Sequence, residues 1–175
     1  LLLLPMLVPD IVLGIALPWL ATRLFRVFTV SVDDNEAVLI LQFGKLVSTL
    51  TRPGLHWVLS RPLPWVSIRR VSLRRDYRTF DRIHVNDAKG TTLIVDLWLE
   101  MRILDPSRAL FSVTDWDASM KNVVTHAAIS ILGDREFHQI LTDRTELGER
   151  LRREVQAETS RWGVAIELLF IRNVT

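Results

Sequence analysis

The sequence predicts an α+β protein that carries an N-terminal transmembrane segment. Three observations predict it: an apolar run at the N-terminus, one long strand with strict period-two alternation, and two amphipathic helices after that strand. The chain has 175 residues, enough for one ordinary domain and a short additional segment. Its net charge is only +2, and it has no Cys, which excludes disulfides, thiol catalysis and Cys-ligated metals.

The N-terminal segment, residues 1–20, is almost continuously apolar, and only Asp10 in it is charged. About twenty apolar residues span a bilayer as a helix, so we predict a membrane anchor within residues 1–27. Its principal apolar residues are Leu7, Ile11, Leu13, Ile15, Leu17 and Trp19. A signal-peptide core and a buried helix are the alternatives, although the first is usually shorter. Three prolines predict a kinked or two-part helix: Pro5, Pro9 and Pro18.

A β-rich region follows the anchor, because FTVSV, DDNE and AVLILQF predict a strand, a turn and a second strand. The segment from Pro53 to Trp65 is too broken by proline for a regular ladder and too apolar for an ordinary solvated loop. Its apolar residues include Leu55, Trp57, Leu59, Leu63 and Trp65. Either the domain core or the membrane interface suits such side chains, and Trp favours the interface. We predict shallow insertion at headgroup depth, with the core as the alternative.

The second half of the chain supplies the clearest strand, Thr91–Ile103, in which apolar residues occupy every second position. One face of this strand is therefore expected to be buried. Around it the sequence predicts a hairpin strand Tyr77–Val85, helices Trp116–Leu132, Phe137–Leu141 and Arg144–Trp162, and a closing strand Ala165–Arg172. The seven glycines are expected at turns.

No constellation of catalytic or metal-binding side chains is apparent in the sequence. The four His residues stand apart, with no second His or carboxylate cluster at ligand spacing. The acids Asp115 and Asp117 are better explained as the start of a helix than as a cation site. A nucleophile–base pair, a phosphate-binding loop and a dinucleotide fingerprint are likewise absent. We therefore predict a non-enzymatic protein without cofactor or metal.

A run of arginines is the one charged feature above background. Four interpretations compete: pairing with acids of a neighbouring subunit, contact with anionic lipid headgroups, a solvated strand face, and nucleic-acid binding. The last is disfavoured because exposed aromatic residues are not interleaved with the arginines. We predict a subunit interface that combines this run with the polar face of the last long helix: Arg69, Arg70, Arg74, Arg75, Arg78, Arg150, Arg153 and Glu154.

The order of five segments resembles the SPFH family, also called band 7, which includes stomatins, prohibitins, flotillins and the HflK/HflC type. The segments are FTVSVDDNEAVLILQFGKLV, RPGLHWVLSRPLPWVSIRRV, NDAKGTTLIVDLWLEMRILDP, LGDREFHQILTDRTELGERLRREVQ and RWGVAIELLFIRNV. No single motif is decisive, but five segments in this order and spacing are specific. The resemblance covers Phe28 to Val174, and a single anchor of the HflK/HflC or prohibitin type fits better than a stomatin hairpin.

This resemblance implies a membrane-proximal β-rich subdomain at 28–78 and an α+β subdomain at 79–175 with helices on one face of an antiparallel sheet. Family members continue into a coiled-coil helix, so we expect the chain to be part of a longer protein. The family forms rings or cages of one chain or of SPFH paralogues. These enclose membrane proteins such as AAA proteases in a bacterial inner membrane or an organellar membrane. The alternative is a monomeric module that docks on a single membrane channel or protease.

Overall fold

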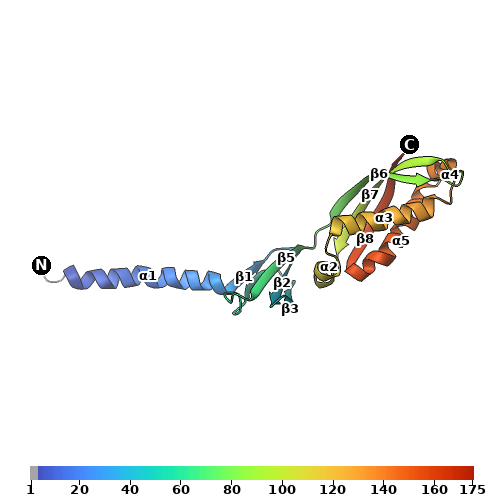
Figure 1. Ribbon diagram of the computed structural model, residues 1–175. Coiled ribbons are helices and arrows are strands. Elements are labelled where there is room, and N and C mark those ends of the chain that lie inside the picture. Colours follow the sequence, from blue (N-terminus) through green and yellow to red (C-terminus); the bar gives the residue numbers. More distant parts are fainter. Residues whose placement is uncertain (1–3) are drawn as a thin grey trace. The chain divides into compact units, whose positions relative to one another are not determined.

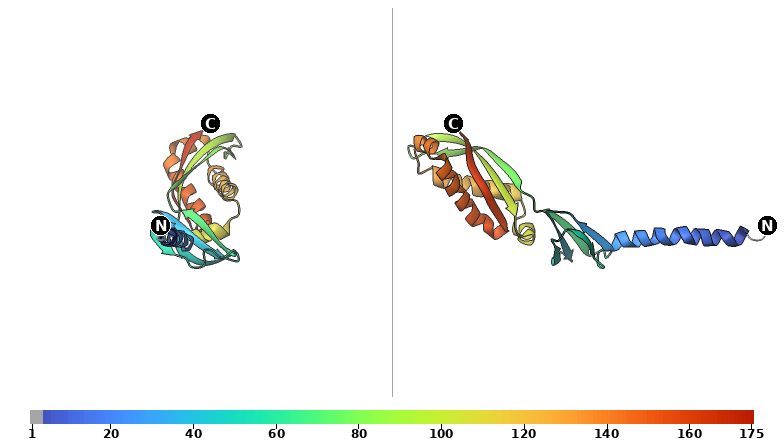
Figure 2. Two further views of the ribbon diagram at one scale, coloured as in Figure 1. Left: turned by 90° about the vertical axis from the view of Figure 1, so that its left-hand side faces the viewer. Right: turned by 180° about the vertical axis from the view of Figure 1, so that it is seen from behind.

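The computed structural model describes the backbone of residues 4–175 and the side chains from residue 16 onward. The chain divides into two compact units, Leu1–Arg70 and Val71–Thr175, which are shown in Figures 1 and 2. The sequence had suggested a division after Arg78. In the structure the strand β6 (Asp76–Asn86) begins before that residue and lies wholly in the second unit.

Helix α1 (Leu4–Phe28) runs unbroken past the end of the predicted apolar run (Figure 1), so the prolines do not divide it into two helices. Pro5 falls in the first turn, where a backbone N–H has no partner within the helix. At its other end, where the chain passes into β1 (Thr29–Val32), the Thr29 hydroxyl donates to the Phe25 carbonyl at 2.7 Å.

Most of the predicted anchor lies outside the described side chains. This holds for Leu7, Ile11, Leu13 and Ile15, whereas Leu17 and Trp19 are described and exposed. Among the described residues, no helix is long and apolar enough to cross a membrane.

The first unit contains two small sheets around one apolar cluster. Strand β1 pairs antiparallel with β4 (Gly54–Trp57), and β2 (Glu36–Gln42) lies between β3 (Lys45–Leu50) and β5 (Val66–Ser72). The buried cluster consists of Val30, Val32, Val38, Ile40 and Val58.

The prediction that the Pro53–Trp65 segment forms no ladder was wrong for its first part. Gly54–Trp57 pairs residue by residue with β1. Pro53 precedes the strand, so the N–H that it lacks is not needed by the ladder.

The second unit is a three-stranded antiparallel sheet in the order β6-β7-β8, with β7 (Thr92–Ile103) in the centre and β8 (Val164–Val174) at one edge. Helices α3 (Trp116–Leu132) and α5 (Arg144–Thr159) cover one face of this sheet, as Figures 1 and 2 show. The shorter elements are α2 (Pro106–Ser112), α4 (Phe137–Thr142) and the 3-10 helix η1 (Ser160–Trp162). The predicted α+β class is confirmed.

The core of the second unit follows the sequence periodicities. Of the alternate residues of β7 that the pattern selected, Ile103 at the end is half-buried and the others are buried: Leu93, Val95, Leu97, Leu99 and Met101. Facing them are the apolar residues at helical spacing from α3 and α5: Met120, Val124, Ala127, Ala128, Leu132, Leu147, Leu151 and Val155. Burial of one face only is what makes both periodicities visible in the sequence.

Gly148 corrects the expectation that the glycines lie at turns, because it is buried within α5. A Cβ atom at this position would lie 2.9 Å from the Leu169 carbonyl oxygen of β8 and 3.5 Å from the Phe170 Cα atom. The helix backbone therefore packs directly on the strand backbone.

Helix α2 was not predicted; the sequence Asp105-Pro106 indicated only the end of a strand. In the structure the Asp105 carboxylate accepts from the backbone N–H groups of Ser107 (3.0 Å) and Arg108 (3.1 Å) and caps the helix, with Pro106 in its first turn. Similarly, Asp115 caps α3, by accepting from the Ala118 N–H at 3.1 Å.

Replacing Asp105 by Ala is expected to lower the free energy of unfolding by about 1 kcal/mol at neutral pH, because two backbone donors lose their acceptor. Hydrogen bonds from the Ser107 hydroxyl and the Arg108 N–H hold the pKa of the Asp105 carboxyl below its ordinary value of 3.8. A depressed pKa stabilises the fold above 3.8, and this contribution is lost as the pH falls through the folded-state pKa.

The difference in urea midpoint between the parent and Asp105→Ala should therefore shrink on acidification from pH 7 to pH 3. The matched control is Asp34→Ala, in an exposed turn, which should have the same urea midpoint as the parent at pH 7 and at pH 3. A difference that stays constant over this pH range would contradict the assigned role of the carboxylate.

Candidate functional site

One end of the first unit collects the segments that lie nearest to α1. Strand β1 starts at this end, and Thr29 is paired with Trp57, the last residue of β4. The Val58 N–H donates to the Phe28 carbonyl at 2.7 Å, and the Phe43 N–H donates to the Trp65 carbonyl at 3.0 Å. The β2–β3 turn, the segment after β4 and the end of α1 are thus brought together, although they are far apart in sequence.

Large apolar side chains are exposed at this end, which we call the apolar end. It comprises Phe25, Phe43, Leu55, Trp57, Leu59 and Trp65. The exposed fraction is 63% for Trp57 and 76% for Leu59, so these side chains are not core residues. Of the predicted loop residues only Leu63 is half-buried, and the neighbouring Val58 belongs to the core.

Phe43 is the member of the apolar end that the sequence did not single out. It has φ 51° and is followed by Gly44 with φ 78°, so two left-handed residues form the tight turn between β2 and β3. This turn projects the Phe43 side chain outward, leaving it 74% exposed and stacked on Trp65 with ring centroids 5.7 Å apart. The sequence feature that could have identified Phe43 is its position directly before Gly44, in the turn after an apolar strand.

Arg61 anchors the segment after β4 to the end of the helix. Its guanidinium donates to the Arg26 carbonyl at 2.7 Å and to the Thr29 carbonyl. The carbonyls at a helix C-terminus carry partial negative charge, which a guanidinium satisfies. Arg61 thereby ties the segment that follows Trp57 and carries Leu59 to the end of α1.

Many of the arginines predicted to form a subunit interface are already paired within the chain. Arg70 contacts Glu36 at 3.0 Å, Arg75 contacts Glu100 at 3.1 Å and Glu167 at 3.6 Å. In α5, Arg150 contacts Glu146 at 2.7 Å. Within the described part of the chain, the predicted interface residues without an ion pair are Arg69, Arg74, Arg153 and Glu154.

Two hollows in the second unit bear on these residues. A polar hollow of about 550 Å³ on the outer side of α3 and α5 is lined by Ser130, Ile131, Asp134, Arg135, Arg150, Arg153 and Glu154. It brings three of the predicted interface residues together. Its mixed charge suits contact with another charged surface.

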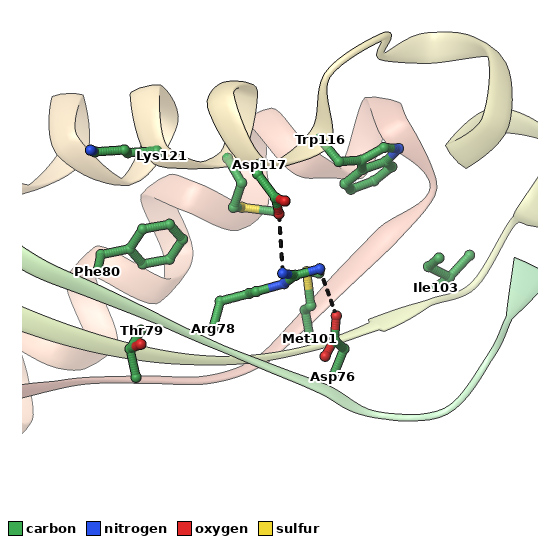
Figure 3. Close-up of a pocket in the computed structure, with 10 residues that line it drawn as sticks. Asp76, Arg78, Thr79, Phe80, Met101, Ile103, Trp116, Asp117 and Lys121 are labelled. Atoms are coloured by element: carbon green, nitrogen blue, oxygen red, sulfur yellow. Dashed lines mark ion pairs between the residues drawn. The ribbon is translucent and has the colours of Figure 1, made fainter.

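The second hollow is an apolar pocket of about 370 Å³ between β6, β7 and the start of α3, drawn in Figure 3. Its lining is Asp76, Arg78, Thr79, Phe80, Met101, Ile103, Trp116, Asp117, Met120 and Lys121. Arg78 contacts both Asp76 and Asp117, each at 3.1 Å. The buried Nε atom of Arg78 has no acceptor among the described residues.

Among the described residues that line the pocket there is no nucleophile with a neighbouring base, and three of the four charged groups, Asp76, Arg78 and Asp117, are paired with one another. Over the residues that the structure describes, no group of three or more His, Cys, Asp or Glu side chains is arranged to hold a metal ion.

Comparison with known proteins matches residues 30–175 to the SPFH domain / Band 7 family. The chain is 22% identical over 162 residues to MJ0827 of Methanocaldococcus jannaschii, covering 89% of this chain and 79% of that protein. It is 24% identical to mouse stomatin over 145 residues, covering 82% of this chain and 50% of stomatin.

It is also 29% identical to HflK of Haemophilus influenzae over 115 residues, covering 64% of this chain and 26% of HflK. The chain thus spans half of stomatin and about a quarter of HflK. The family match covers nearly the whole chain and agrees with the resemblance carried by the five sequence segments. This chain belongs to the SPFH domain / Band 7 family.

Proposed function

We propose that this chain is a membrane-anchored scaffold unit that oligomerises into a ring or cage. Such an assembly organises a patch of membrane and limits access to membrane proteins inside it, for example an AAA protease. The observation that carries the proposal is the apolar end of the first unit. Its exposed aromatic side chains lie where α1 meets the β-rich region, and α1 contains the apolar run.

A lipid bilayer would account for both the apolar run in α1 and the exposed aromatic side chains of the apolar end. The sequence of residues 1–20 predicts a segment that enters the bilayer, and an anchor there would set the apolar end at the headgroup level next to it. Trp is favoured at this depth, because its ring is apolar while its N–H stays hydrated. An irregular backbone exposed to lipid cannot enter the hydrocarbon, so insertion at the apolar end is shallow.

Assembly is supported by charged residues that have no ion pair within the described part of the chain. Arg69 of the first unit, and Arg74 and Glu154 of the second, are available to a neighbouring copy. A contact between two different surfaces of identical subunits closes into a ring when the rotation permits. The similarity to HflK and stomatin supports a membrane scaffold as the class of protein.

The alternative function is a regulatory module that docks as a monomer on one channel or protease. The polar hollow beside α5 would then face that partner instead of a second copy. The size of the protein in detergent distinguishes the two, because a scaffold forms a large closed particle and a module does not.

Replacing Trp57 or Trp65 by Phe is expected to reduce the part of the tryptophan fluorescence that brominated lipids quench, because each ring lies within headgroup or upper acyl depth. The measurement compares each variant with the parent in vesicles of ordinary and brominated phosphatidylcholine. Trp98→Phe is the matched control, since Trp98 lies in the other unit, on the sheet between Tyr77 and Phe170. If neither variant lowers the quenchable signal while the control behaves like the parent, the apolar end does not contact lipid.

A further inference from the structure

Strand β6 is an edge of its sheet, and its first residues present free backbone groups. Ile94 and Thr175 exchange both backbone hydrogen bonds, at 2.8 and 2.9 Å. Even-numbered residues of β7 therefore bond towards β8 and odd-numbered residues towards β6. The register pairs these odd-numbered residues with alternate residues of β6: Leu97 with Phe80, Leu99 with Arg78, and Met101 with Asp76.

The residues between them, Tyr77 and Thr79, consequently point their N–H and C=O groups away from the sheet. The Tyr77 N–H is taken by the Asp76 carboxylate at 3.0 Å. By this alternation the N–H and C=O of Thr79 take no part in the ladder, and among the described residues no turn, loop or side-chain group bonds to them. An unpaired edge of this kind is a template for an added strand.

The apolar pocket lies beside this stretch of the edge. In Figure 3 the side chains of Arg78 and Phe80 point towards α3, whereas Thr79 points to the other side of β6. A further hollow, of about 450 Å³, adjoins the apolar pocket and shares Asp76, Met101 and Ile103 with it. The two together form a groove along the start of β6. On a strand added to this edge, the residue opposite Arg78 would place its side chain on the same face, in the pocket.

The charges at the mouth indicate what kind of segment fits. One guanidinium, that of Arg78, is shared by two largely exposed carboxylates, those of Asp76 and Asp117. The Lys121 ammonium points away from this group in Figure 3. Asp76, Arg78 and Asp117 together carry one net negative charge beside the apolar lining, while Lys121 of the pocket and Arg74 of the adjoining hollow are separate cations. An anionic ligand would meet the two carboxylates, whereas an uncharged or basic peptide segment would not be repelled.

We propose that the β6 edge and this groove bind an extended peptide segment of a partner protein by strand addition. One large apolar side chain fills the pocket, and a basic side chain two residues away lies beside Asp76 and Asp117. Backbone hydrogen bonds to Thr79 hold the strand, and the pocket selects the anchor residue. This site lies in the second unit and requires no contact with lipid, so its test is independent of the proposed membrane function.

The test uses the whole 175-residue chain in detergent micelles and a fluorescein-labelled peptide, Thr-Lys-Thr-Trp-Thr-Lys-Thr, whose charges are symmetric about the Trp anchor. Fluorescence anisotropy is expected to show saturable binding, and replacing the peptide Trp by Ser should abolish it. Asp117→Lys should weaken binding about tenfold or more, because a positive charge replaces a carboxylate beside the basic residue. The control Asp34→Lys, in an exposed turn of the other unit, should bind like the parent.

Hydrogen exchange supplies a second readout that does not depend on a variant. The Thr79 amide should become protected when the peptide binds, as a new ladder bond requires. The proposal is overturned if the Trp peptide does not bind, if the Ser peptide binds equally well, or if the Thr79 amide stays unprotected. It is also overturned if Asp117→Lys leaves binding unchanged. If that variant instead alters the size of the particles while no peptide binds, a second copy occupies the groove.

Discussion

Reversing the charges of Arg69 and Arg74 to Glu is expected to disperse the particles that the protein forms in detergent into single subunits. Neither arginine has an acidic partner within the described part of its own chain, so reversal should leave the fold intact. Like charges placed against each other across an interface cost several kcal/mol, and in a ring this cost is repeated at every contact. Arg75 is unsuitable for this test because it holds Glu100 and Glu167 of the same chain.

The size of the particles is measured by light scattering after size-exclusion chromatography. The matched control is Arg52→Glu, which removes an exposed arginine of the first unit that lies outside the predicted interface. Adding Glu154→Arg to the reversed protein should restore assembly if these charges face each other. Particles of unchanged size in the Arg69/Arg74 variant would rule out this interface, and a monomeric parent would favour the docking module over the scaffold.

Replacing Gly148 by Val is expected to destabilise the second unit by about 3 kcal/mol, at the upper end of the effect of overpacking. The added atoms would meet the Leu169 carbonyl and the Phe170 Cα of β8, and neither can rotate away because both belong to a strand backbone. Intrinsic preference favours the opposite result, since Gly is the least favourable residue in a helix after Pro. The sign of the change therefore tests whether close packing outweighs helix propensity.

The change in stability is measured by urea denaturation of the parent and the variant. Ala157→Val is the matched control, because it adds the same branched side chain at an exposed position of the same helix. The control should lose only about 0.5 kcal/mol through helix propensity. A Gly148→Val protein that is as stable as the parent would show that α5 and β8 can separate without cost.

The residues that the sequence placed correctly are those whose surroundings repeat regularly along the chain. The buried face of β7 appears as every second residue, and α3 spans Trp116–Leu132 as the helical spacing predicted. The short helix α2 was not predicted, because seven residues are too few to show a helical periodicity of apolar side chains. Strand β4 was not predicted, because Pro53 cannot donate a backbone hydrogen bond to a ladder; the ladder begins one residue later, at Gly54.

The candidate sites depended more on tertiary structure than the elements did. The sequence singled out Trp57, Leu59 and Trp65 as apolar residues that an ordinary loop does not carry, but left both core and membrane open. Only the folded chain places them outside the core and brings Phe43 beside Trp65. Similarly, composition could not show that Arg75 finds Glu100, which lies 25 residues further along the chain.

By itself, the sequence determined the α+β class, the one-sided burial of β7, α3 and α5, and membership of the family, because each depends on a local pattern or on the order of segments. The tertiary structure decided which arginines remain unpaired, which aromatic side chains stay exposed, and why a glycine lies inside α5. Those properties arise where segments distant in sequence meet. The spacing of residues along one segment carries no information about the atoms that another segment brings against it.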